Sequence, residues 1–307
     1  MAKELIIGTR GSKLALWQAN YIAKELKGQN PGLEVTLKHI VTTGDKIVDV
    51  PLAKVGGKGL FTKELEQAML AKQIDIAVHS LKDMPVELPE GVTLAAITKR
   101  VHPGDALVSL RYNSLAEVPF NARIGTSSLR RAAQLLNYRP DVSIVNLRGN
   151  IDTRLRKLES ENLDGIVLAV AGLQRLGLEA YISEVIPKEV CLPAVGQGVL
   201  AIEARADDFS VKTLLKGLHH EDTFAAITAE RAFLRMIEGG CQVPVGVFGD
   251  LQEDQLHLEA AIFSLDGKHF IKDFLVGKRE NAEELGNVLA SSMLDAGGKD
   301  LLQEIIK

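Results

Sequence analysis

Arginines recur in this chain at points where a predicted strand gives way to a predicted helix. Arg10 follows the apolar run ELIIGT, Arg130 and Arg131 follow GTSSL, and Arg148 follows VSIVNL. At the carboxyl edge of a sheet these side chains would meet helix N-termini, whose N–H groups and dipoles favour anions. Because a guanidinium binds a carboxylate through two parallel hydrogen bonds, the placement predicts a ligand with several carboxylates. The alternative is a solvated basic helix face.

A lysine and an aspartate follow another apolar strand, at the same predicted edge. The segment DIAVHSLKDMP contains both, as Lys82 and Asp83. A carboxylate there can hold a cationic intermediate or move protons, and the lysine can bind a substrate carboxylate. A helix cap or a turn is the alternative interpretation of such a pair.

The two cysteines, Cys191 and Cys241, receive different interpretations. EGGCQVPVG places Cys241 in a loop after two glycines, which let the backbone bend and leave room near the sulfur. A thiolate is a strong nucleophile where basic groups lower its pKa, although a small buried cysteine is the alternative. Cys191 lies in the apolar run EVCLPAV and is assigned to packing. His219-His220-Glu221 lacks metal-ligand spacing, so we expect a helix start there and no metal.

Strands and helices alternate twice along the chain, which favours two mostly parallel sheets covered by helices. The first series is expected at residues 4–9, 12–26, 33–41, 60–72 and 74–80. The second is expected at residues 123–126, 129–138, 142–147, 151–158 and 165–171. In the first helix, Leu14, Trp17, Tyr21 and Ile22 are predicted to form the buried stripe. An apolar strand at 198–205 could return to the first sheet.

The order of predicted strands and helices changes from about residue 218, where a small α+β region is predicted. A helix at 222–237 is followed by strands at 245–249, 256–264 and 270–276, with Asp266-Gly267 as a hairpin signal. A helix at 282–294 is expected to close the chain. The predicted fold class is therefore α/β, with two lobes, a hinged cleft that binds ligands, and a C-terminal α+β domain. The predicted domains are 1–98 plus 199–217, 99–198 and 218–307.

Charge is distributed unevenly over a chain whose net charge is −4. Residues 123–157 carry eight bases against two acids, whereas residues 251–307 carry six bases against eleven acids. An anion site is therefore expected in the middle of the chain, and a nonspecific nucleic-acid binder is disfavoured. With no export signal and no apolar run of membrane-spanning length, we expect a cytoplasmic protein and no membrane partner.

Eight motifs together resemble the porphobilinogen deaminase (hydroxymethylbilane synthase) family, in order and in spacing, from Thr9 to about Gly246. They are TRGSKLALWQ (9–18), KVGGKGLFTKELE (54–66), DIAVHSLKDMP (75–85), GTSSLRRAAQL (125–135), LRGNIDTRLRKL (147–158), LAVAGLQRLG (168–177), LPAVGQG (192–198) and EGGCQVPVG (238–246). The resemblance implies two lobes like those of type II periplasmic binding proteins, plus the small third domain.

The resemblance also implies a transferase of haem biosynthesis. Its reaction is the stepwise condensation of four porphobilinogen molecules, with loss of ammonia, to give the linear tetrapyrrole hydroxymethylbilane. By the same resemblance, Cys241 carries a dipyrromethane primer through a thioether, and Asp83 is the catalytic acid. A monomer with a small-molecule substrate is expected.

The remaining site residues are carried over from the matching motifs. Eight of them match positions that bind acetate and propionate groups: Arg10, Ser12, Lys82, Arg130, Arg131, Arg148, Arg154 and Arg175. Ser128 and Gln197 lie in motifs that line the same cleft. The glycine segment Val55 to Gly59, with Lys58 and the nearby Phe61, is interpreted as a mobile lid.

Two other classes of protein are possible from the residues alone. A non-catalytic solute-binding module would also use an arginine-lined cleft between two lobes, but it usually requires export and leaves Cys241 without a use. An effector domain of a transcription regulator is disfavoured because no helix-turn-helix precedes the first strand. Intact mass would separate these classes, since only the enzyme carries two linked pyrrole units.

Overall fold

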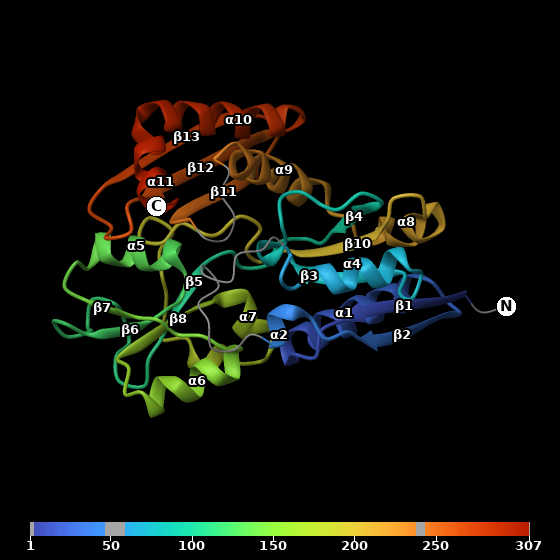
Figure 1. The fold of residues 1–307 in the computed structure, drawn as a ribbon, viewed down its shortest axis with the longest axis horizontal. Coiled ribbons are helices and arrows are strands. Elements are labelled where there is room, and N and C mark those ends of the chain that lie inside the picture. Colours follow the sequence, from blue (N-terminus) through green and yellow to red (C-terminus); the bar gives the residue numbers. More distant parts are fainter. Residues whose placement is uncertain (1–2, 47–58, 238–242, 307) are drawn as a thin grey trace. The chain divides into compact units, whose positions relative to one another are not determined.

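Figure 1 shows the computed structural model, which describes residues 3–46, 59–237 and 243–306 of the chain. The chain divides into two compact units, and each is described by itself below. Unit 1 comprises Met1–Arg100 with Val199–Phe224, and unit 2 comprises Val101–Gly198 with Ala225–Lys307.

Unit 1 is built on a five-stranded sheet with the order β2-β1-β3-β10-β4. Its strands are β1 (Lys3–Thr9), β2 (Leu33–His39), β3 (Ile76–Ser80), β4 (Val92–Ile97) and β10 (Leu200–Arg205). Strand β1 pairs in parallel with β2 and β3, whereas β10 runs antiparallel to β3 and β4. The expected return of an apolar strand near residue 200 to the first sheet is therefore confirmed.

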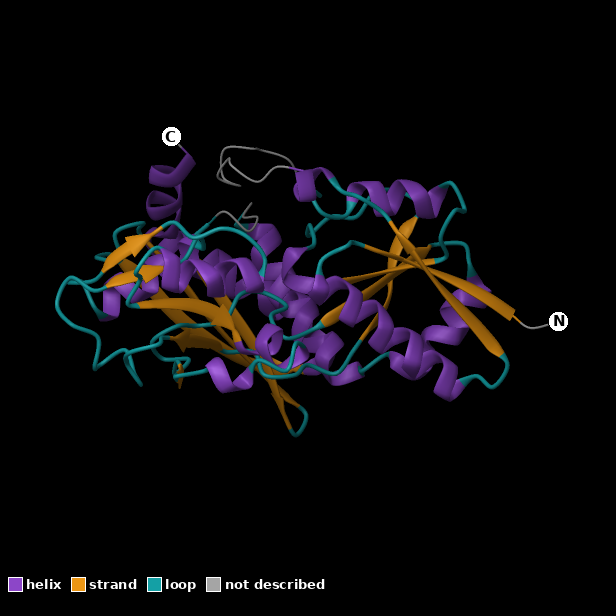
Figure 2. Cartoon of the chain, turned by 90° about the horizontal axis from the view of Figure 1, so that it is seen from below, coloured by secondary structure: helices purple, strands orange, loops and turns teal. Residues whose placement is uncertain are grey.

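Helices cover both faces of this sheet, as Figure 2 shows from below. They are α1 (Lys13–Gln29), α4 (Lys63–Leu70) and α8 (Phe209–Leu215), with the short α2 (Thr43–Lys46) after the second strand. Because side chains alternate along a strand, Ile76 and Val78 pack with α1 and α8, whereas Ala77 packs under α4. Helix α4 begins three residues later than expected, because residues 59–62 form a turn.

The prediction that Trp17 and Tyr21 belong to the buried face of α1 is wrong. Trp17 and Tyr21 are 36% and 38% exposed, and their rings stack on each other with centroids 5.3 Å apart. The face that packs on the sheet consists mainly of smaller and aliphatic side chains: Ala15, Gln18, Ala19, Ile22 and Leu26. The small residues let the helix lie close to the strands, while the two aromatic rings cover each other near solvent.

Unit 2 begins with a second five-stranded sheet, in the order β7-β6-β8-β5-β9. Its strands are β5 (Asp105–Val108), β6 (Arg123–Gly125), β7 (Ser143–Val145), β8 (Gly165–Ala169) and β9 (Glu184–Val185). Its helices are α5 (Leu129–Tyr138), α6 (Ile151–Ser160) and α7 (Val170–Arg175). The parallel strands β7, β6 and β8 and the antiparallel β5 repeat the plan of unit 1. The two predicted α/β lobes are therefore confirmed, although β4, β5 and β9 were not predicted from the sequence.

The rest of unit 2 is the predicted α+β region. An antiparallel sheet of β11 (Val245–Gln252), β12 (Gln255–Phe263) and β13 (Phe270–Lys278) follows α9 (Glu221–Met236). Helix α10 (Ala282–Met293) packs on β13 and β12 (Figure 1). The chain does not close with that helix, because a π-helical turn at Leu294–Gly298 leads into α11 (Lys299–Ile306).

The hairpin between β12 and β13 reaches helix α5 of the second lobe. Gly267 has φ +72°, a left-handed value that favours glycine, and a Cβ there would lie 2.4 Å from the Ala133 carbonyl oxygen. Asn137 donates a hydrogen bond to the Gly267 carbonyl at 2.9 Å. The three-domain division stays a prediction, since the C-terminal sheet and the second lobe belong to one compact unit. Within the described ranges, no helix is both long enough and apolar enough to cross a membrane.

Candidate active site

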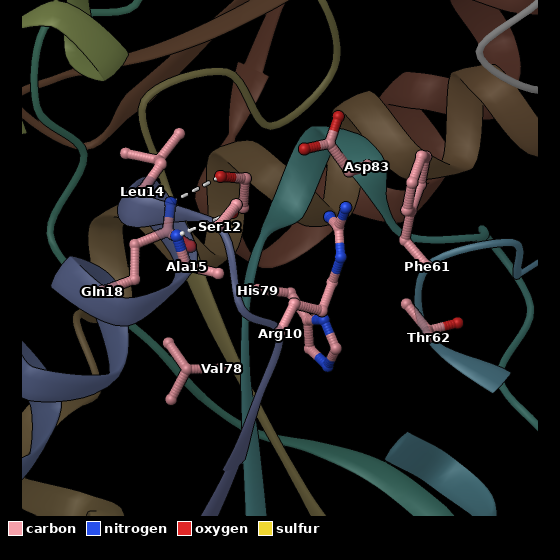
Figure 3. A pocket seen from close by; sticks show the side chains of 11 residues that line it. Arg10, Ser12, Leu14, Ala15, Gln18, Phe61, Thr62, Val78, His79 and Asp83 are labelled. Carbon is pink, nitrogen blue, oxygen red and sulfur yellow. Dashed lines mark hydrogen bonds between the residues drawn. The ribbon is translucent and has the colours of Figure 1, made fainter. Parts of the chain in front are cut away.

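A pocket lies in unit 1, at the carboxyl ends of the neighbouring strands β1 and β3. Figure 3 shows it from close by, with side chains contributed by the segment after β1, by α1, by the turn before α4 and by β3. The residues that line it are Arg10, Ser12, Leu14, Ala15, Gln18, Phe61, Thr62, Val78, His79, Ser80 and Asp83. The predicted site residues Arg10, Ser12 and Asp83 are thus brought together, because parallel strands end at the same edge of a sheet.

Arg10 is held in place by an acid and an aromatic ring. Its Nη2 forms an ion pair of 2.5 Å with Asp45, and its guanidinium lies 4.1 Å from the centre of the Phe61 ring. Burial raises the pKa of Asp45. Hydrogen bonds from Arg10 and Thr42 and the charge of Arg10 together lower it by more, so the pKa of Asp45 lies below its ordinary value. Arg10 is therefore a fixed cation whose charge Asp45 already partly neutralises.

Asp83 differs from Asp45, because its carboxylate is exposed and open to a ligand. It ends the 3₁₀ turn η1 (Leu81–Asp83), and it makes no hydrogen bond or ion pair with the rest of the described chain. Figure 3 shows its oxygens on the side of the pocket toward which the Arg10 guanidinium points. Lys82 precedes it in the same turn and is half-buried. An unpaired carboxylate beside a fixed cation can bind a cationic group or exchange a proton with a substrate.

Ser12 has a structural contact in addition to its place in the pocket. Its hydroxyl accepts a hydrogen bond of 3.2 Å from the Ala15 amide and so caps helix α1. Gln18, one turn further along, donates to the Ser80 hydroxyl at 2.7 Å. The bond from Gln18 joins helix α1 to the end of β3, and both residues line the pocket.

The second lobe contains a buried ionic cluster centred on Asp105. Arg130 and Arg131 both reach this carboxylate, at 2.8 and 2.6 Å. Burial alone would lower the pKa of Arg130, but the charge of Asp105 and the contacts with Asp105 and Cys191 together outweigh burial and hold that pKa above the ordinary value. Two guanidiniums share one carboxylate, so the cluster keeps one positive charge in excess. A buried excess charge is costly, and a ligand carboxylate would offset it.

Gln197 and Cys191 complete this cluster. The Gln197 side-chain amide donates to Asp105 at 2.9 Å and to the Pro103 carbonyl at 2.6 Å. Cys191 is fully buried, as predicted for a packing residue, and burial raises the pKa of its thiol to about 12. Cys191 is therefore neutral and unreactive at ordinary pH. The binding role predicted for Gln197 stays a prediction beside this structural contact.

The other predicted anion-binding residues lie at the ends of the strands and helices of the same lobe. Arg148 follows β7, and its Nη1 is buried without a hydrogen-bond partner among the residues described. Arg154 in α6 donates through Nε to the Gly149 carbonyl at 2.8 Å. Arg175 ends α7, is 8% exposed, and donates to the Gly198 carbonyl at 2.9 Å. Ser128 caps α5 by accepting from the Arg131 amide.

These features fit a cofactor that carries several carboxylates. The orphaned Nη1 of Arg148 and the excess charge around Asp105 both call for anionic partners that the described chain does not supply. Cys241, predicted to anchor such a cofactor, lies outside the described residues, as do Lys58 and most of the predicted lid. Phe61, assigned to the lid from sequence, is a pocket residue stacked under Arg10.

The sequence analysis missed the two acids that organise the arginines. Asp45 lies in TTGDK and Asp105 opens the apolar strand DALV. A charged residue at the start of a fully apolar strand is a usable signal, because buried carboxylates need cationic partners. His220 accepts a hydrogen bond from the Thr223 amide at 3.2 Å, which agrees with the expected helix start. In the ranges that the structure describes, no group of three or more His, Cys, Asp or Glu side chains could hold a metal ion.

The fold and the site define a class: a two-lobed α/β protein with an open carboxylate in one lobe and a basic cluster in the other. Comparison with known proteins identifies the family. The model for the porphobilinogen deaminase dipyrromethane cofactor-binding domain matches residues 5–213, and that for the porphobilinogen deaminase C-terminal domain matches residues 224–295. The chain belongs to the porphobilinogen deaminase family. It is a transferase of tetrapyrrole biosynthesis, a hydroxymethylbilane synthase, with a dipyrromethane cofactor.

Relatives match over nearly the whole length. The porphobilinogen deaminase of Desulforamulus reducens is 52% identical over 305 residues, covering 99% of this chain and 99% of that protein. That of Geotalea uraniireducens is 53% identical over 303 residues, covering 99% of this chain and 95% of its own length. That of Carboxydothermus hydrogenoformans is 50% identical over 305 residues, covering 99% and 98% of the two chains.

Solved structures of lower similarity include solute-binding proteins. The methionine-binding protein MetQ is 17% identical with a TM-score of 0.47, covering 70% of this chain and 89% of its own. A periplasmic substrate-binding protein of an ABC transporter from Coxiella burnetii is 15% identical with a TM-score of 0.46, covering 70% and 92%.

Proposed function

We propose that Asp83 is the proton-handling group of this synthase, and that the arginines of both lobes hold the carboxylates of its pyrrole ligands. The reaction condenses four porphobilinogen molecules, with release of ammonia, into a linear tetrapyrrole. Each addition breaks the bond between the aminomethyl carbon and its nitrogen, which builds positive charge on the pyrrole. An anionic oxygen of Asp83 would stabilise that charge and the cationic aminomethyl group before it leaves.

One observation carries this assignment: the Asp83 carboxylate is open, whereas the other acids beside arginines are already paired. Asp45 is bound to Arg10, and Asp105 is bound to two guanidiniums. Asp83 faces the same pocket as Arg10 and Ser12 without such a partner in the described chain. A paired acid would have to lose its arginine before it could act, so Asp83 is the acid that is ready for a cationic substrate group.

The dipyrromethane, when bound, supplies the free pyrrole position to which new units are joined. Its attachment to Cys241 through a thioether is what the resemblance of the GGCQ motif to the family implies. Arg131 and Arg148 would hold its carboxylates, since the first belongs to a cluster with excess positive charge and the second has a buried orphan nitrogen. Arg130 is bonded to Asp105 and to the Leu192 carbonyl, and Arg131 is bonded to Asp105 and to the Val167 carbonyl, so both also hold the cluster together.

The remaining binding residues extend this arrangement. Lys82 beside Asp83 and Arg154 and Arg175 in the second lobe would each take a carboxylate of the substrate or growing chain. Ser128 and Gln197 would orient the Arg131 end of α5 and the Asp105 cluster. The lid role of Lys58 and Phe61, the monomeric state, the cytoplasmic location and the absence of nucleic-acid partners remain proposals that rest on sequence and family.

The test is stoichiometry in a purified system. With porphobilinogen as the only substrate, the protein should consume four molecules and release four of ammonia for each linear tetrapyrrole formed. Substrate binding without ammonia release would favour the alternative, a solute-binding module. Full-length similarity to porphobilinogen deaminases weighs against that alternative.

A further inference from the structure

A buried histidine and two buried glutamates lie directly behind the Asp83 pocket. His79 lines the pocket, and its Nε2 lies 2.9 Å from Oε2 of Glu203, although both atoms are buried and neither makes a hydrogen bond among the described residues. His79 is 6% exposed, Glu66 is 7% exposed and Glu203 is fully buried. One side of the imidazole therefore meets the pocket, while the other meets a carboxylate that solvent does not reach.

The sheet register places these groups on one face. His79 pairs with Ala201 across β3 and β10, and Glu203 pairs with Ala77. Residues two apart on a strand share a face, so the imidazole and the carboxylate are diagonal neighbours. Helix α4, which carries Glu66, covers this face of the sheet. The arrangement is thus fixed by backbone pairing and by helix packing.

Buried charged groups in this region need an explanation, because burying apolar side chains there would cost less free energy. The charged and titratable groups around His79 are Glu203 on β10, Glu64 and Glu66 on α4, Arg10 after β1 and Asp83 after β3. Burial raises the pKa of Glu66, and the negative charge of Glu203 raises it further. Glu203 is fully buried, and His79 is its only ion-pair partner among the described residues.

We propose that His79 is a second proton-transfer group of the Asp83 pocket and that Glu203 is its positioning residue. A carboxylate this close to one ring nitrogen stabilises the imidazolium that forms when the other nitrogen takes a proton. The inference rests on the proposed function of the pocket.

The chemistry of each addition supplies a use for this group. The C–N bond of the incoming unit breaks, and its electron pair leaves on ammonia. The new C–C bond forms, and the receiving pyrrole carbon loses its proton, which balances the proton that ammonia takes up to become ammonium. Asp83 interacts with the cationic unit during this exchange, and His79 accepts the proton from the receiving carbon and passes it on.

The proposal is tested in the holoenzyme with Glu203→Gln and His79→Gln, beside the exposed strand variants Glu34→Gln and His39→Gln as controls. His79→Gln should lower kcat about 100-fold, within the usual range for a proton-transfer group, with KM changed less than about twofold. In Glu203→Gln the imidazolium loses its counterion, so the acid limb of the pH–rate profile should move to lower pH. The controls should leave both properties unchanged.

A measurement that does not use activity accompanies the kinetics. Imidazole nitrogen signals, followed by NMR against pH, should show one histidine of the seven whose titration moves to lower pH in Glu203→Gln. The signal should be absent from the spectrum of His79→Gln. If His79→Gln does not fold, the measurements on Glu203→Gln test the proposal alone. An unchanged acid limb together with unchanged histidine titrations would overturn the proposal. A wild-type protein that forms no tetrapyrrole would instead refute the proposed function.

Discussion

The aspartates beside Arg10, Arg130 and Arg131 decide what these arginines can bind. Asp45 neutralises Arg10, while Asp105 is shared by Arg130 and Arg131 and so leaves a positive excess. Asp83 is the one carboxylate among the described residues that line the pocket, and it is exposed. In both lobes, aspartates offset only part of the positive charge of the arginines. We therefore expect the carboxylates of a ligand to be held where positive charge remains.

Asp83→Asn tests the open carboxylate. The amide has the same shape, so the variant should fold with an unchanged melting temperature, while kcat falls by about 10²–10⁴-fold because the negative charge is lost. Single-turnover ammonia release measures this directly. Glu87→Gln, a change four residues away, serves as the control. If the Asp83→Asn variant kept most of its activity, Asp83 would have no part in the chemistry.

Asp105→Asn tests the buried cluster. Two guanidiniums would then lack their carboxylate, and breaking a buried ion pair typically destabilises a protein by about 3–5 kcal/mol. Denaturant unfolding should show this loss. Glu161→Gln removes the exposed partner of Lys157 and should cost about 0–1 kcal/mol. Equal stability of the two variants would contradict the central place given to Asp105.

At this scale the sequence predicts the site in part. Arg10, Ser12 and Asp83 could be grouped because they follow neighbouring parallel strands, whose ends must meet. The pairing of Arg130 and Arg131 with Asp105 could not be foreseen, since β5 was not recognised and its position in the sheet depends on long-range pairing. Isolated motifs show which side chains exist, but the pairing of charges depends on which strands become neighbours.

The elements carry the site by strand alternation. Successive residues of β3 face α1, then α4, so Val78 joins one core and Ala77 the other. The polar residues His79 and Ser80 continue this alternation at the strand end, where they reach the pocket. Periodicity predicted most strands and helices, but it misjudged α1, where small side chains and not the aromatic pair face the sheet.

Glu66→Gln tests the electrostatics under α4. Burial and the charge of Glu203 raise the pKa of Glu66 in the folded protein. A raised carboxyl pKa means that stability is fully present below the unfolded value, near 4.5, and is lost as pH rises through the folded value. Glu66→Gln should therefore raise the melting temperature at pH 7 and have no advantage below about pH 4.

Thermal unfolding at both pH values, beside the exposed variant Glu34→Gln, supplies the measurement. A melting temperature that falls equally at both pH values would show that Glu66 contributes through packing and not through its protonation.

At the scale of the whole molecule, the two lobes repeat the same strand order but differ in the charged side chains that they place at the strand ends. Two lobes share one strand plan, and only the first places an open acid at its strand ends among the residues described. Fold alone could not separate an enzyme from a solute-binding module. The motifs and the full-length family match make that distinction. The third region follows the predicted order of strands, but its packing on α5 required the structure.

The two cysteines should differ in reactivity. Burial raises the pKa of the Cys191 thiol to about 12, so Cys191 should resist alkylation in the native enzyme at pH 8. After denaturation, Cys191 should react fully, whereas a thioether at Cys241 would block the second sulfur. Peptide mapping after iodoacetamide treatment counts both. Two reactive thiols in the denatured enzyme would rule out a thioether.

The most direct test of the account is the intact mass of the purified, untreated enzyme. The enzyme should be heavier than the 307-residue chain by the mass of two linked pyrrole units, and these units should be located on the peptide that contains Cys241. A mass equal to that of the bare chain, in protein that nevertheless releases tetrapyrrole from porphobilinogen, would contradict the covalent primer on which the arrangement of arginines has been explained.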